Sequence, residues 1–508
     1  MEARSIPAGN AFESAIAELE ETIRILKSGT SLKQDHVDLE KLIEERQRET
    51  SRLLLEAAFA ARGSGDVGAS VTAADSNSHT HKRERTTHVK SVFGEVELTR
   101  TGYGRPGLES LFPLDGMLNL ASDIYSLNLR SMLGNEAARG SFDDAIRAVA
   151  SRTGVKIPKR QAEELVQKAA IDFDVFYERR IKAPEEQALL DRQPILVLTT
   201  DAKGIVMRPE SLREATRKRA EEAESKLTKR LSRGEKRNAK RMAQVASLYG
   251  IERHVRRPEQ VAGIEEKSDI KLPRPVGKRV WASVEKEQDT VIRDLFNEAE
   301  TRDADQKMDW VVLVDGQLSQ LDRIEKEALR KNKRITIVVD VVHVIEYVWK
   351  AARCFYEETD SKGEQWVTEH LLHILRGEAK TVAAGIRRSA TFQNLKASDR
   401  EPVDKCADYL HKNAAYLNYD EYLKKGYPIA TGVIEGACRY LVKDRMDVTG
   451  ARWTLKGAEA VLKLRSLHAS GDLEEYWDFH QAQEHERNHV SKYEKPAVLG
   501  RGGLKLVK

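Results

Sequence analysis

The spacing of apolar residues divides the chain into helical ends and a strand-rich middle. Residues 11–62 carry Leu, Ile and Ala at three- and four-residue intervals between charged residues, which is the period of an amphipathic helix. This pattern predicts an N-terminal helical region at residues 1–62, although the heptad spacing is too irregular to predict a coiled coil. Residues 63–88 are rich in Gly, Ser, Thr and charge, which predicts a flexible linker.

Residues 89–190 combine a predicted hairpin with helices. Apolar and polar residues alternate around Gly94, which predicts the hairpin. The helical part has the outline of a helix-turn-helix, because Ser141 can cap a first helix and Pro158 can open a second one. In that interpretation the second helix brings Lys159 and Arg160 to DNA. An ordinary helical hairpin is the alternative, and the pattern alone favours it.

Strongly apolar runs dominate residues 191–349, in the order three strands, helix, strand, helix, strand, helix. Strands this apolar are usually buried on both faces, so the pattern predicts an α/β layer. Residues 350–425 show only helical spacing, and residues 426–470 predict one or two further helices, broken near residues 449–450. Residues 471–508 predict a C-terminal helix followed by a flexible basic tail. The fold class is therefore a multidomain α+β or α/β protein.

Length and composition agree with this division. The chain has 508 residues, which suggests about three domains. Its formal net charge of +4 excludes a histone-like basic protein and an acidic disordered tail protein. No apolar stretch is long enough for a membrane helix or resembles a signal peptide, and the sparse cysteines lead us to expect a protein of the reducing cytoplasm. The three cysteines are far apart, which argues against a disulfide framework and a four-cysteine zinc site.

The charge is distributed unevenly. Residues 217–243 hold 11 Lys or Arg against 4 Glu, and residues 487–508 hold 6 against 1. Such a run is most often a solvated face, but its single sign favours contact with the DNA backbone. The expected contacts in this run are Arg217, Lys218, Arg219, Lys229, Arg230, Arg233, Lys236, Arg237, Lys240 and Arg241.

Three carboxylates are candidate metal ligands. Asp201 and Asp315 each end a predicted buried strand, and open α/β sheets place their sites at such ends. Glu435 shares one predicted helix face with Arg439 and Lys443. This set suits a site that holds Mg²⁺ together with a phosphate chain. A strand-terminal Asp often only caps the next helix, and we weigh the two interpretations about equally for the three acids together.

Asp340 competes with Asp315 for the second position. It also ends a predicted buried strand, and His343 follows three residues later in the first turn of a helix. Asp340 can cap that helix. His343 can contact a DNA phosphate or orient a carboxylate, and a structural histidine is the commoner case.

Five sequence blocks carry a resemblance to a known family: TTDAKG, WVVLVDG, VVDVVHVIEYVWKAA, TGVIEGACRYLVKDRMDVTGARW and AEAVLKLRS. They resemble the Kra-type bacterial insertion-sequence transposases, which are ribonuclease H-like enzymes of the Asp-Asp-Glu class related to the Mutator-like group. The resemblance covers roughly residues 85–470. It implies a ribonuclease H-like core at residues 191–349, an all-helical insertion at 350–425, and core-closing helices with the catalytic Glu at 426–470.

The resemblance also implies the site residues. Asp201, Asp315 and Glu435 would be the catalytic acids that bind two Mg²⁺ ions, for which Mn²⁺ can substitute. Asp340 and His343 match a secondary motif that follows the second acid in the related group, which favours Asp315 over Asp340 in the triad. Relatives often carry a cysteine-rich knuckle near the N-terminal hairpin. This chain has no cysteine there, so we expect no structural zinc.

The function implied is DNA transposition, with cleavage at the element's ends followed by strand transfer into target DNA. The expected partners are double-stranded DNA, as terminal inverted repeats and target, and a second copy of the chain in a homodimer or larger oligomer at the nucleoid. Arg439, Lys443 and Arg452 would add DNA contacts. The alternatives are an inactive or domesticated transposase derivative and a structure-specific nuclease.

Overall fold

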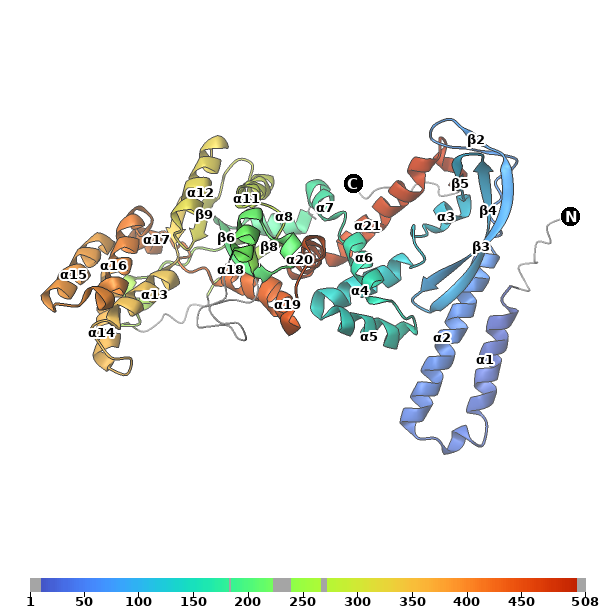
Figure 1. Cartoon of the computed structure of the whole chain (residues 1–508), viewed down its shortest axis with the longest axis horizontal. Coiled ribbons are helices and arrows are strands. Elements are labelled where there is room, and N and C mark those ends of the chain that lie inside the picture. The colour runs from blue at the N-terminus through green and yellow to red at the C-terminus, as the bar shows by residue number, and fades with distance from the viewer. Residues whose placement is uncertain (1–10, 182–183, 223–238, 266–271, 500–508) are drawn as a thin grey trace. The chain divides into compact units, whose positions relative to one another are not determined.

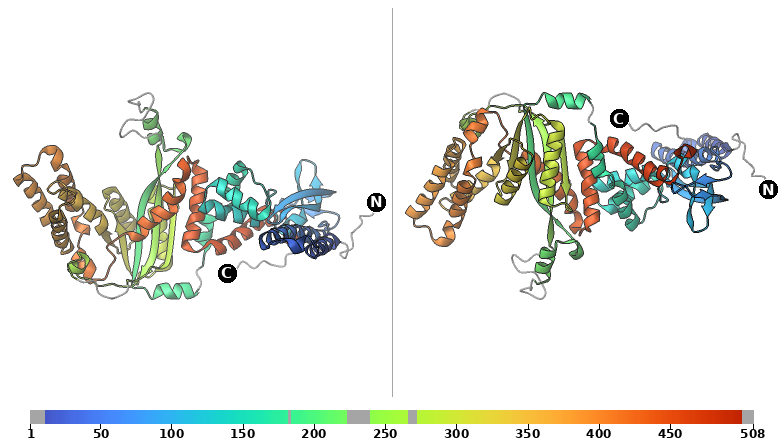
Figure 2. Two further views of the ribbon diagram at one scale, coloured as in Figure 1. Left: turned by 90° about the horizontal axis from the view of Figure 1, so that it is seen from below. Right: turned by 90° about the horizontal axis from the view of Figure 1, so that it is seen from above.

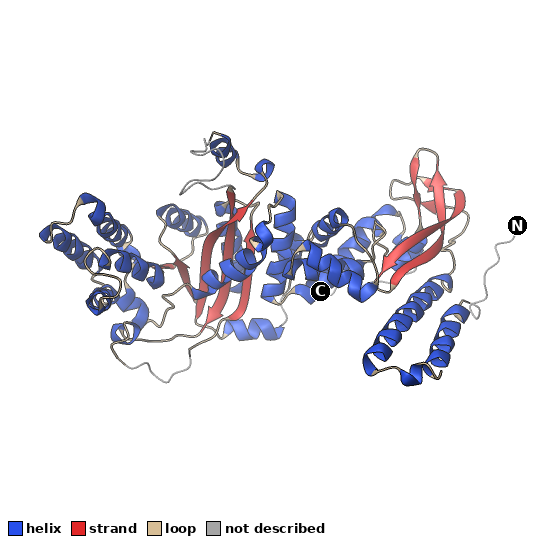
Figure 3. Cartoon of the chain, turned by 60° about the horizontal axis from the view of Figure 1, so that its bottom comes forward, coloured by secondary structure: helices blue, strands red, loops and turns tan. Residues whose placement is uncertain are grey.

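The computed structural model describes residues 11–181, 184–222, 239–265 and 272–499. The protein is mixed α/β, with several small sheets among many helices (Figures 1 and 3). It divides into two compact units. Unit 1 comprises Met1–Ile181 and Gly471–Lys508, and unit 2 comprises Lys182–Ser470. None of the helices in the described ranges has both the length and the apolar character to cross a membrane.

Unit 1 begins with a helical hairpin followed by antiparallel strands. Helices α1 (Glu13–Leu26) and α2 (His36–Ala60) form the hairpin. A three-stranded sheet has the order β3-β4-β5, and β1 pairs with β2 in a short ladder. The strand bounds are Val71–Thr72 for β1, Ser78–His79 for β2, His81–Ser91 for β3, Gly94–Arg105 for β4 and Leu108–Leu111 for β5.

The prediction of a linker at residues 63–88 is wrong from residue 71 onward. Strand β3 pairs with β4 along its whole length, from His81 opposite Gly104 to Ser91 opposite Gly94. Most β3 side chains are exposed, so the strand lacks the apolar alternation by which strands are recognised in a sequence. Its stability comes from backbone hydrogen bonds to β4, whose Val96, Leu98 and Tyr103 are buried.

Five helices complete the N-terminal part of unit 1. The predicted helix-turn-helix outline corresponds to α5 and α6: Ser141 accepts a hydrogen bond from the Asp144 N–H, and Gly154 ends α5 at a φ of 73°. The bounds are Pro113–Leu118 for α3, Leu127–Arg139 for α4, Phe142–Thr153 for α5, Lys159–Ala169 for α6 and Phe173–Arg179 for α7.

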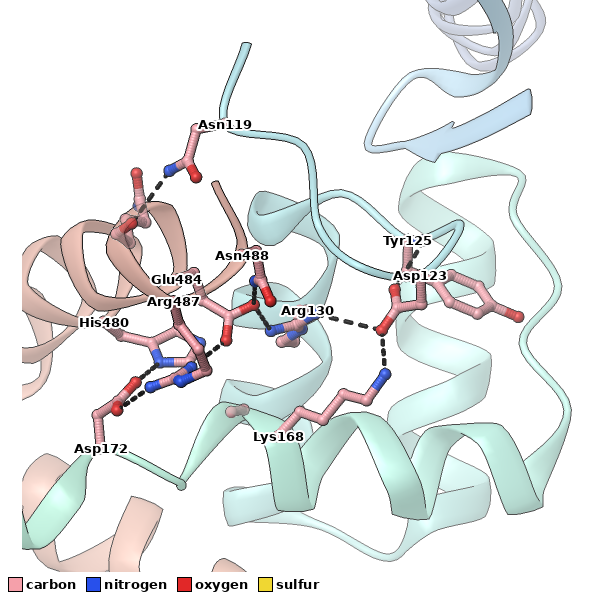
Figure 4. A network of polar contacts seen from close by, with 12 residues as sticks. Asn119, Asp123, Tyr125, Arg130, Lys168, Asp172, His480, Glu484, Arg487 and Asn488 are labelled. Atoms are coloured by element: carbon pink, nitrogen blue, oxygen red, sulfur yellow. Dashed lines mark hydrogen bonds and ion pairs between the residues drawn. The ribbon is translucent and has the colours of Figure 1, made fainter. Parts of the chain in front are cut away.

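The C-terminal helix α21 (Leu473–Asn488) belongs to unit 1. A buried charge network joins it to the N-terminal helices (Figure 4). Arg130 of α4 is 1% exposed and bonds to Glu484 at 2.8 Å and to Asp123 at 3.2 Å. His480 Nδ1 lies 2.7 Å from Asp172 Oδ2. Arg487 pairs with Asp172 and Glu484, and Lys168 pairs with Asp123.

The predicted flexible tail at residues 487–508 is wrong for its described part, which ends at residue 499. His489 bonds to the Leu120 carbonyl at 2.7 Å, and Tyr493 forms a bridge with Ala73. Tyr493 and Leu499 are buried in one apolar cluster. The segment is mostly basic, and its few apolar residues were too sparse in the sequence to predict that they would be buried.

Unit 2 is built on a five-stranded sheet with the order β10-β9-β6-β7-β8. Strands β6, β9 and β10 are parallel, whereas β7 is antiparallel to both β6 and β8. The bounds are Ile195–Val206 for β6, Lys240–Ile251 for β7, Val276–Ser283 for β8, Asp309–Val314 for β9 and Thr336–Val339 for β10. These strands agree with the five predicted from apolar runs.

Helices flank the sheet and cover one of its edges. Helix α11 packs on β6 and β7, and α20 packs along the edge strand β8 (Figure 2). Side chains of α20 bind backbone N–H groups in and just after β8: Ser470 with Val280, Ser466 with Ala282, and Glu459 with Val284. These hydrogen bonds occupy backbone N–H groups of the edge strand that could otherwise pair with another strand. The bounds are Pro184–Asp191 for α8, Glu214–Glu221 for α9, Pro258–Val261 for α10, Gln288–Arg302 for α11, Leu318–Arg330 for α12 and Leu455–Ser470 for α20.

Residues 350–425 are helical, as predicted. Their helices share one apolar cluster with the sheet, in which Val311 and Val338 meet Ile386, Leu410 and others. The segment therefore completes the core of unit 2 instead of forming a separate core. The bounds are Val341–Ala352 for α13, Ser361–Leu375 for α14, Ala379–Phe392 for α15, Ala397–Lys412 for α16 and Tyr419–Lys424 for α17.

Candidate functional site

Asp201 lies within β6 and not at its end, which corrects the sequence interpretation. Parallel pairing with β9 stops at Thr199 opposite Leu313, but antiparallel pairing with β7 continues to Val206. Asp201 therefore stands just beyond the last residue pair with β9. Its Oδ1 accepts a hydrogen bond from the Ala202 N–H at 2.6 Å, and its Oδ2 accepts one from the Cys438 thiol at 3.2 Å.

Asp315 follows directly after β9. The next residue, Gly316, has a φ of 83°, a conformation that favours glycine. The Tyr409 hydroxyl donates a hydrogen bond to the Asp315 carbonyl at 2.7 Å, which fixes the backbone at this turn. Burial raises the pKa of the Asp315 carboxyl, and the negative charge of Asp201 raises it further. Thr199 lies opposite Leu313 in the parallel pairing of β6 with β9, so continuation of that register brings Asp201 and Asp315 to the same end of the two strands.

Asp340 follows β10 and caps α13, as expected. It is fully buried; its Oδ1 accepts from the Val342 N–H at 2.9 Å, and its Oδ2 lies 3.2 Å from His343 Nδ1. The hydrogen bond to Asp340 raises the pKa of His343 to about 9, and the charges of Asp340 and Asp315 act in the same direction. His343 therefore carries a positive charge at neutral pH.

Glu435 lies on the short helix α18 (Gly432–Ala437) and is exposed. The Thr431 hydroxyl donates to Asp340 and lies 3.4 Å from Glu435 Oε1, so it stands between the two acids. Asp340, His343 and Glu435 each place one potential metal-ligand atom within 4.8 Å of the other two. The structure thus brings the predicted third acid to the predicted secondary motif.

Asp201, Asp315 and Asp340 lie at the same end of the parallel strands β6, β9 and β10, and Glu435 lies beside Asp340. The Asp340 N–H donates to the Val314 carbonyl at 2.8 Å, which places the ends of β9 and β10 side by side. Cys438, three residues after Glu435, connects the same helical segment to Asp201. Two cationic side chains act on this group of acids: His343 beside Asp340, and Lys203, whose positive charge acts on Cys438. Carboxylate oxygens are the ligands that Mg²⁺ and Mn²⁺ prefer, so the donor set fits these ions.

Three residues at the site were missed from the sequence. Thr431 and Cys438 lie in the block around Glu435, but nothing in their spacing indicates a bond to Asp340 or Asp201. Tyr409 lies in α16, far from any motif. Burial raises the pKa of the Cys438 thiol, so Cys438 remains a neutral hydrogen-bond donor at neutral pH.

The expected face of Glu435, Arg439 and Lys443 is not a regular α-helical face. Cys438–Lys443 forms a π-helical turn, which adds a residue to the turn and breaks the four-residue alignment. All three side chains are exposed, and Arg439 lies 3.7 Å from Asp444. Single π-helical turns occur frequently at functional sites.

The basic residues of the 217–243 run have different surroundings. Lys218 pairs with Glu214 at 2.8 Å and Arg217 with Glu221 at 3.8 Å on α9, and Arg219 and Lys240 are exposed. The Arg241 guanidinium donates to the carbonyls of Val284, Ser211 and Glu285. Lys229, Arg230, Arg233, Lys236 and Arg237 lie outside the described residues.

The other expected DNA contacts are on the surface of their own units. Lys159 and Arg160 lie in the first turn of α6 in unit 1, where each also forms an ion pair, with Asp143 and Glu164 respectively. Arg452 of unit 2 is exposed, next to the buried Trp453.

Comparison with known proteins gives no assignment. Neither the protein-family models nor the curated protein sequences contain a match to this chain.

Proposed function

We propose that this protein is a metal-dependent DNA transposase of a bacterial insertion sequence. The observation that carries the proposal is geometric: Asp201 and Asp315 lie at the same end of two neighbouring parallel strands, and Cys438 links the segment that carries Glu435 to Asp201. Carboxylates so arranged suit phosphodiester chemistry with two divalent ions.

The strand arrangement supports the finer proposal of a ribonuclease H-like core. Strands β6, β7 and β8 form a consecutive antiparallel meander, and β9 and β10 add in parallel on the other side of β6. Only β7 runs against the other four strands. Along the chain, three strands are followed by helix, strand, helix and strand, which is the order that the resemblance implies, with α14–α17 as the insertion before the catalytic Glu.

Asp201, Asp315 and Glu435 would hold two Mg²⁺ or Mn²⁺ ions. When bound, these ions would activate the attacking oxygen and stabilise the leaving oxygen of the phosphodiester. The Cys438 thiol and the Ala202 N–H orient the carboxylate of Asp201. Tyr409 fixes the backbone of Asp315, and Thr431 fixes Asp340 relative to Glu435. His343, held charged by Asp340, offsets part of the negative charge of the site before the ions bind.

The same site would perform two displacements at phosphorus. In the first, water attacks the phosphodiester at an element end and frees a 3′-hydroxyl. In the second, that hydroxyl attacks a phosphodiester of the target, one P–O bond forms, one breaks, and the displaced 3′-oxygen leaves. The basic residues of α6, α9 and the π-helical turn would hold the DNA backbone, so binding should weaken steeply with salt.

Cleavage and joining of DNA test the proposal. The probe is a duplex that carries the DNA at one end of the element containing the gene, incubated with the full chain and Mg²⁺. We expect Asp201→Asn and Glu435→Gln each to reduce cleavage more than roughly 100-fold, because loss of a group that only supports a metal ligand already costs about 10–100-fold. Glu369→Gln, which alters an exposed acid of α14, is the matched control and should be unaffected.

The products separate the proposed function from its alternatives. Joined DNA molecules support a transposase. Cleavage without joining would instead indicate a nuclease, and DNA binding without cleavage an inactive derivative. Full activity of Asp201→Asn would refute the assignment of the site.

A further inference from the structure

One face of α1 carries an apolar seam that the described residues of unit 1 leave uncovered. Phe12, Ile16, Leu19, Ile23 and Leu26 follow each other at alternating intervals of four and three residues. This is the a/d spacing of a helix that packs against another helix. The three central residues are 53%, 51% and 44% exposed. Irregular spacing elsewhere in residues 11–62 conceals this short regular stretch.

The contact between α1 and α2 uses a different and more polar face. Glu18 pairs with Arg46 of α2 at 2.9 Å, and Thr22 accepts a hydrogen bond from Arg46 at 3.2 Å. Ala15 is buried on the same side. Each of these residues precedes a seam residue by one position, so the two faces lie about 100° apart around the helix. The hairpin, seen at the N-terminal end of unit 1 in Figure 1, therefore leaves the more apolar face of α1 open.

We propose that the seam of α1 binds the same seam of a second copy of this chain, with the two helices antiparallel. In antiparallel pairing, a positions face d positions. Leu19 then meets Ile23 of the partner subunit, and Ile16 meets Leu26 of the partner subunit. These four positions are symmetric about residue 21. In a single antiparallel arrangement, each of them on either copy therefore has an apolar partner on the other copy. This is the self-complementarity that a two-fold interface requires.

The charges of α1 favour a second copy in this orientation. Glu13 begins the helix and Lys27 follows its last residue, whereas Glu20 and Glu21 lie near its middle and Arg24 pairs with Glu21. Antiparallel pairing places the acidic start of each helix beside the basic end of the other, whereas parallel pairing places the two Glu13 side chains together and the two Lys27 side chains together. Glu13 then lies beside Lys27 of the partner subunit, and this pair occurs twice.

The contact is short, which determines how the dimer should behave. Helix α1 has 14 residues, a length of about 21 Å. A seam of two heptads buries less area than a standard stable interface. We therefore expect an association that depends on protein concentration. It depends on the surface of α1 alone and not on the proposed transposase activity.

The first experiment measures the mass of the full chain by sedimentation over a range of concentrations. We expect a monomer–dimer equilibrium for the wild type and a monomer for Leu19→Lys. Leu32→Lys is the matched control, because Leu32 is 76% exposed on the same hairpin but lies off the seam. A wild type that stays monomeric throughout, or a Leu19→Lys variant that dimerises like the wild type, would overturn the proposal.

Charge variants test the orientation without removing an apolar residue. Glu13→Lys should raise the dimer Kd roughly tenfold, because two attractive pairs become repulsive. Adding Lys27→Glu should restore the wild-type Kd, since both pairs become attractive again. Glu20 lies beside its own copy at the two-fold axis, so Glu20→Gln should lower the Kd. A double variant no better than Glu13→Lys alone would contradict antiparallel self-pairing.

Discussion

Replacing Arg130 with Met tests whether the charge network in Figure 4 holds the C-terminal helix on unit 1. Arg130 is almost fully buried and donates to Glu484 of α21 and to Asp123. Methionine keeps much of the side chain's length and removes only the charge and the donors. The substitution therefore acts on the ion pairs more than on the packing.

The expected cost follows from what each carboxylate retains. Removing one partner of a buried ion pair costs about 3–5 kcal/mol, because the remaining charge stays buried. Glu484 keeps Arg487 at 2.5 Å, and Asp123 keeps Lys168 at 2.6 Å. The loss should therefore lie near the lower limit, about 3 kcal/mol. The control Arg160→Met, at a side chain 90% exposed, should change stability by less than about 0.5 kcal/mol.

Hydrogen exchange followed by mass spectrometry resolves the effect by segment, which matters because two units need not unfold together. A loss of about 3 kcal/mol accelerates exchange of the slowest amides in α4 and α21 roughly 100-fold. Strands β6 and β9, in unit 2, should exchange as in the wild type. Unchanged exchange in α21 would refute the view that this network attaches the helix.

Further predictions concern pH, positioning and capping. Burial lowers the pKa of His489 to about 4 from its ordinary 6.5, so the folded state favours the neutral ring; unit 1 should be fully stable above about pH 6.5 and lose about 3 kcal/mol as the pH falls toward 4. His489→Gln should weaken the dependence of the stability of unit 1 on pH, measured by calorimetry. An equally steep dependence in the variant and the wild type would contradict the assignment to His489. Tyr409→Phe should slow DNA cleavage about tenfold and raise the Mg²⁺ requirement, with a stability loss of only about 1 kcal/mol; an unchanged Mg²⁺ requirement would exclude positioning of Asp315. Ser141→Ala should destabilise α5 by about 1 kcal/mol through loss of its cap, measured by exchange of α5 amides, and protection equal to the wild type would show that the cap does not matter.

Elements with a strong local signal were predictable from the sequence. Strand β9 is apolar at nearly every position and is buried throughout its last five residues, so its run of Val and Leu identified it. The cap at Asp340 depends on its own helix, α13, and was also foreseen. Local pattern suffices where the residue and its partner are neighbours in the sequence.

Features that depend on distant partners were not predictable. Strand β3 is polar from His81 to His88 and forms because β4 pairs with it. Helix α21 joins unit 1 through residues more than 300 positions away, as in the bond between Arg130 and Glu484. The π-helical turn after Glu435 changes the alignment of Glu435, Arg439 and Lys443, which was predicted on the assumption of a regular α-helix. For the same reason the sequence indicated Asp201 and Glu435 but not the bond that connects Cys438 to Asp201.

A crystal structure of the full chain with Mn²⁺ and DNA from the end of its element tests the central claim most directly, because anomalous scattering locates the ions. The proposed function predicts two Mn²⁺ ions roughly 4 Å apart, ligated by Asp201, Asp315 and Glu435 and contacting one phosphate of the DNA. Manganese bound only by Asp340, His343 and Glu435, or absent from this end of the sheet while DNA is bound, would contradict the account.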